Sequence, residues 1–91
     1  MARFVAITEK PGLTEDQFRE ALNRTGKWRF GKRSWVIKAY CALDKGKLVI
    51  ECETPEQSQF EQWLESNGWK AREVHKVNFI HEGGLVWSIK S

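Results

Sequence analysis

The sequence predicts an α+β domain in which an antiparallel sheet of four strands carries two helices on one face. The first observation is the order of the patterns along the 91 residues: strand, helix, strand, strand, helix, strand. This order is the split βαβ, ferredoxin-like arrangement. The second observation is that both helical segments open on the same start signal and end at a glycine. Because a chain of this length suits one core, we expect a single ferredoxin-like domain over residues 1–91.

The strands are predicted from alternating or apolar runs that are rich in β-branched and aromatic residues. The turn sequence "LDKG" joins the two central runs. The dipeptide Gly83-Gly84 is a two-residue hairpin turn and leads into a short extra strand. The expected strands are "RFVAIT" (3–8), "SWVIKAYCA" (34–42), "KLVIECE" (47–53), "EVHKVNFI" (73–80) and "LVWSIK" (85–90).

Each helix is predicted from a capping box, in which an N-cap threonine is followed three residues later by glutamine. Thr14 and Gln17 form the first box. Thr54 and Gln57 form the second, which adds Pro55 at the first helical position. A glycine is the usual residue just after a helix. The glycines expected to end the two helices are Gly26 and Gly68.

The central hairpin places its side chains on two unlike faces. In the register that the turn sets, Lys38 lies opposite Glu51. Cys52 then lies opposite Ile37, four residues from Cys41 along the ladder or about 13 Å. A disulfide needs Cα atoms within about 7 Å, so we expect two buried thiols. The apolar face, expected to meet the helices, carries Trp35, Ile37, Ala39, Cys41, Leu48, Ile50 and Cys52. The other face carries Val36, Lys38, Tyr40, Val49, Glu51 and Glu53.

This second face has no helix to cover it in the predicted arrangement. Its mixed side chains suit contact with another copy, and small soluble proteins most often form two-fold dimers. A few of the five Trp and five Phe would build most of a small core, and others suit an oligomer interface. We therefore expect a homodimer or larger homo-oligomer, associated as in the dimeric α/β barrels. The candidate ligand-binding residues are Lys38, Tyr40, Glu51 and Glu53.

The charge pattern bears on partners and location. Fifteen basic and twelve acidic residues give a net charge of +3, and both kinds are spread along the chain. Nucleic-acid-binding domains usually gather positive charge on one face instead. No apolar run approaches the roughly 20 residues of a membrane span. We expect a cytoplasmic protein with no membrane partner.

The most basic stretch, residues 24–33, has two interpretations. Its cationic side chains, interleaved with Trp28 and Phe30, would grip phosphates and stack bases. Alternatively, the first helix ends there and a loop returns to the sheet with both aromatic side chains beneath it. We favour the junction, because the strand 47–53 carries two acids and no aromatic where an RNA-binding version of this fold stacks bases. The basic residues are Arg24, Lys27, Arg29, Lys32 and Arg33.

Catalytic and metal-binding motifs are missing from the sequence. It has no nucleophile–base pair, phosphate loop or dinucleotide fingerprint. Glu51 and Glu53 point the same way and could do acid–base work, although an ion pair with Lys38 explains them equally well. No C-x-x-C or H-x-x-x-H spacing occurs. His75 and His81 lie about 20 Å apart on a strand, so one ion could take both only from two protomers.

Residues 35–77 contain a succession of four short segments: "WVIKAY", "DKGKLVIECETPEQ", "LESNGW" and "REVHKV". It resembles a family of small ferredoxin-like proteins, domain of unknown function 4242, which includes nickel-binding members. Ile50 stands in the place of that family's strand cysteine, with Cys52 two positions later on the same side, and Trp69-Lys70 replaces its proline segment. The resemblance implies a homodimer that binds nickel or another divalent metal. The candidate metal ligands are His75 and Cys52.

The sequence thus favours a small cytoplasmic protein that binds a ligand or a metal as a homodimer, rather than an enzyme. One alternative is a dimeric α/β-barrel enzyme, of the monooxygenase or isomerase kind, with the same open-face residues lining a cavity. A second is nucleic-acid binding through residues 24–33. A purely structural or assembly role also stays open.

Overall fold

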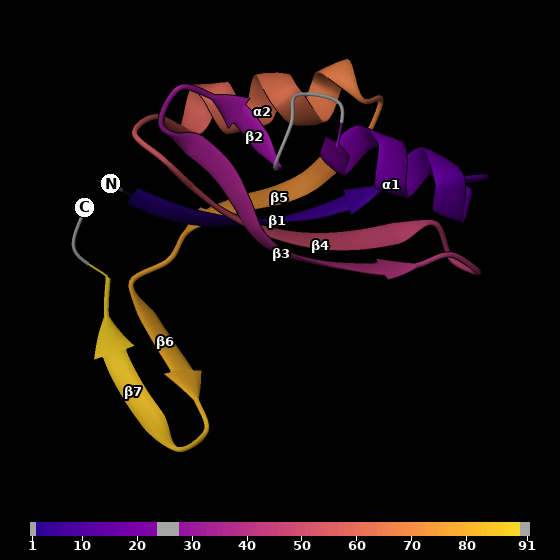
Figure 1. Cartoon of the computed structure of the whole chain (residues 1–91). Coiled ribbons are helices and arrows are strands. Elements are labelled where there is room, and N and C mark those ends of the chain that lie inside the picture. The colour runs from indigo at the N-terminus through magenta and orange to yellow at the C-terminus, as the bar shows by residue number, and fades with distance from the viewer. Residues whose placement is uncertain (1, 24–27, 90–91) are drawn as a thin grey trace.

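The computed structural model describes residues 2–23 and 28–89, and within them it contains an antiparallel sheet of five strands. The strand order is β2-β3-β4-β1-β5, and both helices lie on one face of the sheet (Figure 1). A separate hairpin of β6 and β7 extends from the other side (Figure 1). The predicted α+β class is confirmed. The elements are β1 (Ala2–Glu9), α1 (Glu15–Asn23), β2 (Arg29–Gly31), β3 (Ser34–Ala42), β4 (Lys47–Thr54), α2 (Gln57–Ser66), β5 (Lys70–Lys76), β6 (Phe79–Glu82) and β7 (Leu85–Ser88).

The core lies between the helices and the sheet, and it follows from the period-two alternation of the central strands. In β1 and β4 the even-numbered residues are buried and face the helices. A cluster of aromatic rings packs above this layer, with neighbouring ring centroids 5.2 to 6.4 Å apart. Its members are Phe30, Phe60, Trp63 and Trp69.

A β-bulge in β3 interrupts the predicted register. Val36 pairs with Cys52 and Lys38 pairs with Glu51, so Ile37 is an extra residue without a partner on β4. Lys38 opposite Glu51 is therefore confirmed. The predicted pairing of Cys52 with Ile37 is wrong by one residue, because an alternating sequence gives no sign of an inserted residue.

The bulge also changes which residues of β3 face the helices. Val36 enters the core, whereas it was predicted on the open face. Trp35 pairs with Glu53 on the open face, whereas it was predicted toward the helices. Cys41 and Cys52 are both free thiols, as predicted, but only Cys52 is buried as expected, and Cys41 is partly exposed.

The start of α1 confirms the first capping box. The Gln17 N–H donates to Oγ1 of Thr14 at 3.2 Å, and the Thr14 N–H donates to Oε1 of Gln17 at 3.1 Å. The helix is amphipathic, yet Ala21 is its buried residue, and Phe18 and Leu22 stay half-buried. The predicted end at Gly26 lies outside the described residues.

The start of α2 differs from the prediction. Glu56, not Thr54, holds the N-cap position, and it makes no side-chain capping bond. Thr54 is buried, where its hydroxyl shares a 2.8 Å hydrogen bond with Ser34 Oγ. Ser34 Oγ is also 2.8 Å from Oε1 of Gln59. Thr54 thus joins a buried polar network between β3, β4 and α2, and that role competes with capping.

The end of α2 is the predicted glycine. Gly68 has a φ of 70°, in the left-handed region that favours glycine. Its N–H donates to the Glu65 carbonyl at 2.9 Å, and the Trp69 N–H donates to the Leu64 carbonyl at 3.0 Å. These two bonds form a Schellman motif, which turns Trp69 into the core. Neither helix within the described ranges is long and apolar enough to cross a membrane.

The segment predicted as one strand over 73–80 is two strands, β5 and β6. The chain leaves the sheet at Val77, whose N–H donates to the Arg3 carbonyl at 2.8 Å. The extra strand after Gly83-Gly84 is confirmed as β7, paired with β6 in a hairpin of its own. β2 has no counterpart among the predicted strands, because three residues are too few to show alternation.

Gly46, in the turn between β3 and β4, provides a test of this packing. Its φ is +63°, and a Cβ at this position would lie 2.7 Å from the Lys10 carbonyl oxygen. We expect Gly46→Ala to lower the free energy of unfolding by about 1–3 kcal/mol from backbone strain, with the clash adding to that. Gly12→Ala is the matched control, since Gly12 also has a positive φ but no atom within 4 Å of its Cβ position. Chemical denaturation that gives equal losses for both variants would contradict the clash.

Candidate functional site

The sheet face opposite the helices, here called the open face, brings together the four predicted ligand-binding residues. Cross-strand pairing aligns the strands β3, β4, β1 and β5 so that side chains form rows across this face. One row consists of Lys38, Glu51, Val5 and His75. The next row consists of Tyr40, Val49, Ile7 and Glu73.

Arg3 holds both glutamates of the predicted site. Its guanidinium nitrogens lie 3.3 Å from Oε2 of Glu51 and 2.8 Å from Oε1 of Glu53. The Arg3 side chain is only 19% exposed, so this pairing is sheltered from water. Its Nε is buried and has no hydrogen-bond partner in the described part of the chain. Arg3 was not among the predicted site residues, although it shares the alternation of Val5 in the segment 3–8.

Lys38 and Tyr40 form a second pair on the open face. The Lys38 ammonium lies 5.5 Å from the centre of the Tyr40 ring, and 3.9 Å from Oε2 of Glu82 on β6. A hydrogen bond to Tyr40 is the main cause that raises the pKa of Lys38, followed by the charges of Tyr40, Glu82 and Glu51. The ammonium therefore keeps its charge at neutral pH, and it is exposed to a ligand or a partner.

The two predicted metal ligands lie on opposite faces of the sheet. His75 is on the exposed side of β5, where its Nε2 lies 2.9 Å from Oε1 of Glu73. Cys52 is buried under the helices, and burial raises the pKa of its thiol to about 12. His75 and Cys52 therefore do not fit one ion in this protomer. The described residues include no cluster of three or more His, Cys, Asp or Glu side chains that could hold a metal.

The basic stretch 24–33 is described only from Trp28 onward, so Arg24 and Lys27 lie outside the described residues. Phe30 stacks on Trp63, with ring centroids 5.2 Å apart, as the junction interpretation predicts. Trp28 is 56% exposed, contrary to the prediction that it lies beneath the loop. The aromatic side chains of this stretch therefore divide between the core and the surface.

The hairpin of β6 and β7, here called the arm, exposes an unusual amount of apolar surface. Phe79, Leu85 and Val86 are 70%, 69% and 66% exposed, and Trp87 is exposed as well. The arm extends on the side of the open face (Figure 1). The contact between Lys38 on β3 and Glu82 on β6 also places the arm beside the open face. Exposed apolar patches of this kind are often found where proteins bind partners.

No protein-family model matches the sequence, and neither does any curated protein. The fold is similar to that of the crystal structure of SCO4226 from Streptomyces coelicolor A3(2), with a TM-score of 0.67. The two chains are 23% identical over 84% of this chain and 95% of the other. At that identity the likeness shows the fold alone.

Proposed function

We propose that this chain is a small ligand-binding protein of the ferredoxin-like class, which works as a homodimer. The order β3-β4-β1-β5, with α1 and α2 as the two crossover helices, supports the class. The resemblance of residues 35–77 to domain of unknown function 4242 supports the same class.

The observation that carries the dimer is the arm beside the open face. An isolated two-stranded hairpin is only marginally stable in water, so it gains from packing against another surface. The open face offers exposed apolar side chains for that contact, among them Ile7, Val49 and Tyr40. In a two-fold dimer, each copy would lay its arm on the open face of the other.

The chemistry of the open face favours a small organic acid as the ligand. Lys38, Tyr40 and His75 supply hydrogen-bond donors, and Lys38 is charged. Arg3 pairs with both Glu51 and Glu53 and offsets one of their two negative charges, so these carboxylates repel an anion less than free ones would. The dimer would enclose this cluster between its two sheets.

The dimer is tested with the double variant Leu85→Glu and Trp87→Glu, by sedimentation and native mass spectrometry. Wild-type protein is expected to be a dimer at micromolar concentration. The variant is expected to be a monomer with an unchanged far-ultraviolet spectrum, because two charges cannot be buried in an apolar interface at low cost. Leu43→Glu, an exposed leucine on the body of the domain, is the matched control and should stay a dimer. A monomeric wild type, or a dimeric double variant, would overturn the proposal.

The ligand is tested with a panel of small mono- and dicarboxylic acids, by thermal shift and by NMR shifts of the open-face amides. At least one acid should raise the melting temperature of wild-type protein. Lys38→Met should weaken its binding about tenfold or more, the loss typical of a charged hydrogen bond. Lys45→Met, an exposed lysine in the turn after β3, should have no effect. The ligand class is wrong if no acid binds, or if Lys38→Met binds as well as wild type.

A divalent metal is a second candidate, and the pair His75 and Glu73 favours it. One nitrogen and one oxygen ligand per copy would give four ligands if the two-fold axis brings the pairs together. Native mass spectrometry of untagged protein with nickel or zinc should then show one ion per dimer. His75→Ala should lose the ion, and His81→Ala, the control on the arm, should keep it. A dimer without metal in every case would exclude this candidate and leave the organic ligand untouched.

A further inference from the structure

The centre of the open face is an apolar strip that two neighbouring strands share. It consists of Val5 and Ile7 on β1 and Val49 on β4, and Ile7 lies directly opposite Val49. Ile7 and Val49 are 38% and 40% exposed, so both side chains meet water in the single chain. Strands lie about 4.8 Å apart, so two of them cover about 10 Å of the face. The strip can therefore hold a hydrocarbon chain of medium length.

The two ends of this strip differ in charge. At the β3 end, Lys38 and Tyr40 lie beside it, and the Tyr40 hydroxyl forms a hydrogen bond with the Lys38 ammonium. At the β5 end lie Glu73 and His75, with 2.9 Å between Oε1 of Glu73 and Nε2 of His75. Three strand spacings, or about 14 Å, separate β3 from β5. An anion is therefore attracted at the β3 end and repelled by the carboxylate at the β5 end.

Ion pairs close the other two sides of the strip. On one side, an Arg3 guanidinium nitrogen lies 3.3 Å from Oε2 of Glu51. On the other side, Arg72 lies 2.9 Å from Oε2 of Glu9. A second exposed cation, Lys47, lies directly opposite Glu9, whose carboxylate offsets its charge. An apolar group is therefore confined to the centre of the face, with Lys38 as the better cation for a carboxylate.

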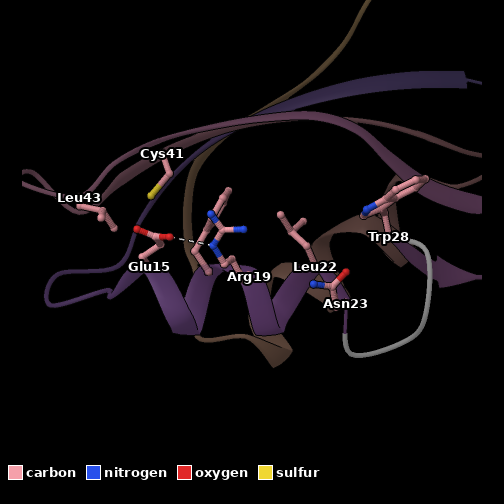
Figure 2. Close-up of a pocket in the computed structure, with 8 residues that line it drawn as sticks. Glu15, Arg19, Leu22, Asn23, Trp28, Cys41 and Leu43 are labelled. Atoms are coloured by element: carbon pink, nitrogen blue, oxygen red, sulfur yellow. Dashed lines mark hydrogen bonds and ion pairs between the residues drawn. The ribbon is translucent and has the colours of Figure 1, made fainter.

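A hollow on the helix side of the sheet offers apolar surface without a free charge. It lies between α1 and β3 and has a volume of about 450 Å³ (Figure 2). Figure 2 shows Glu15 and Arg19 on its α1 wall, joined at 2.8 Å, and Leu43 beyond them. Because these two charges satisfy each other, the hollow does not favour a carboxylate. It serves as the comparison for apolar binding that needs no anion.

We propose that the open face binds a monocarboxylic acid with an unbranched apolar tail, of the medium-chain fatty acid class. This inference rests on the proposed organic-acid function and names the class of acid. The carboxylate would accept hydrogen bonds from Lys38 and Tyr40, and the tail would cross Val49 and Ile7 toward β5. In the dimer, the apolar arm of the other copy would cover the tail. Glu73 would disfavour a second carboxylate at the far end.

The test compares the affinities of butanoate and octanoate by NMR titration of the full chain. Octanoate should bind wild-type protein about tenfold or more tightly, because each CH₂ that leaves water raises the affinity up to about fourfold. The double variant Ile7→Thr and Val49→Thr should reduce this preference to about threefold or less, because hydroxyls then face the tail. Val49→Thr alone is the second variant, with a smaller loss, in case the double variant does not form the dimer. Leu43→Thr, in the hollow of Figure 2, is the matched control and should keep the wild-type preference.

The direction of the tail is tested at its two ends. Glu73→Gln should raise the ratio of octanedioate to octanoate affinity about threefold, the size typical of an exposed charge interaction. Lys47→Met should leave the octanoate affinity unchanged, because the carboxylate lies at Lys38.

Four results would overturn this inference. The first is equal affinity of wild-type protein for butanoate and octanoate. The second is loss of the octanoate preference in Leu43→Thr, or its full retention in both threonine variants of the strip. The third is an unchanged affinity ratio in Glu73→Gln, and the fourth is loss of octanoate binding in Lys47→Met. A small acid still binds the wild type in all four cases, so the proposed function stands. Failure of every acid to bind would instead overturn the proposed ligand class, and this inference with it.

Discussion

Phe60→Ala is expected to lower the free energy of unfolding by about 3–5 kcal/mol. Phe60 is fully buried on α2, and its ring lies 5.8 Å from the Phe30 ring and 6.4 Å from the Trp63 ring. Truncation removes buried apolar surface and leaves a cavity that the surrounding rings fill only in part. Small domains have a total stability of about 5–15 kcal/mol, so this variant would keep little of it.

The measurement is denaturant unfolding, followed by tryptophan fluorescence and circular dichroism at two protein concentrations. If the variant lost stability by dissociating into monomers, its unfolding midpoint would depend on protein concentration. A loss of stability within the domain would not. Phe60→Leu is the matched comparison and should lose less than Phe60→Ala, because leucine keeps most of the apolar volume. A loss below about 1 kcal/mol for Phe60→Ala, the size typical of average substitutions, would show that the aromatic cluster does not hold α2 to the sheet.

The parts of the fold that follow local rules could be predicted from the sequence. Alternation identified β1, β3 and β4, and the reciprocal bonds of Thr14 and Gln17 follow directly from their spacing. Gly68 ends α2 because only a residue that adopts a positive φ suits that position. These features depend on residues a few positions apart, which a sequence displays side by side.

The errors in the fold arise where distant residues decide the outcome. Thr54 has the residue type of an N-cap, but its hydroxyl bonds to Ser34, twenty positions away in the chain. The bulge at Ile37 depends on how β3 meets β4 and β2, and its residue type is ordinary for a strand. Propensity and pattern are weak guides where tertiary contacts compete with them.

The candidate site was predicted in part for the same reason. Lys38 and Glu51 could be placed opposite each other, since the turn between their strands sets the register. Arg3 was missed, because its partners Glu51 and Glu53 lie on a strand that joins β1 only in the folded sheet. The sequence places Cys52 on the helix side of the sheet, yet it was also predicted to be a metal ligand. Its thiol is buried on that side and cannot share an ion with His75, which lies on the open face.

Cys52 leads to the second large prediction, a loss of stability at alkaline pH. Its thiol has a pKa of about 12 in the folded protein, because burial disfavours the thiolate, while an unfolded thiol titrates near 8.5. The stability that the buried Cys52 thiol contributes is fully present below the pKa of the unfolded thiol. It is lost as the pH rises toward the pKa of the folded thiol. In this window the unfolded chain has released a proton that the folded chain keeps. Stability should fall by about 1.4 kcal/mol per pH unit, or about 5 kcal/mol over the whole window between the two pKa values.

The measurement compares unfolding free energies from pH 8 to pH 11 for wild type and Cys52→Ala. Cys52→Ala should lack this fall in stability with pH. The unfolding free energies of wild type and variant should therefore converge as the pH rises. Cys41→Ala is the control, since Cys41 is partly exposed and burial raises the pKa of its thiol less. Parallel curves for wild type and Cys52→Ala would mean that the thiol ionises readily in the folded state. A thiolate would then form under the helices at moderate pH, and burial would not be what keeps this thiol protonated.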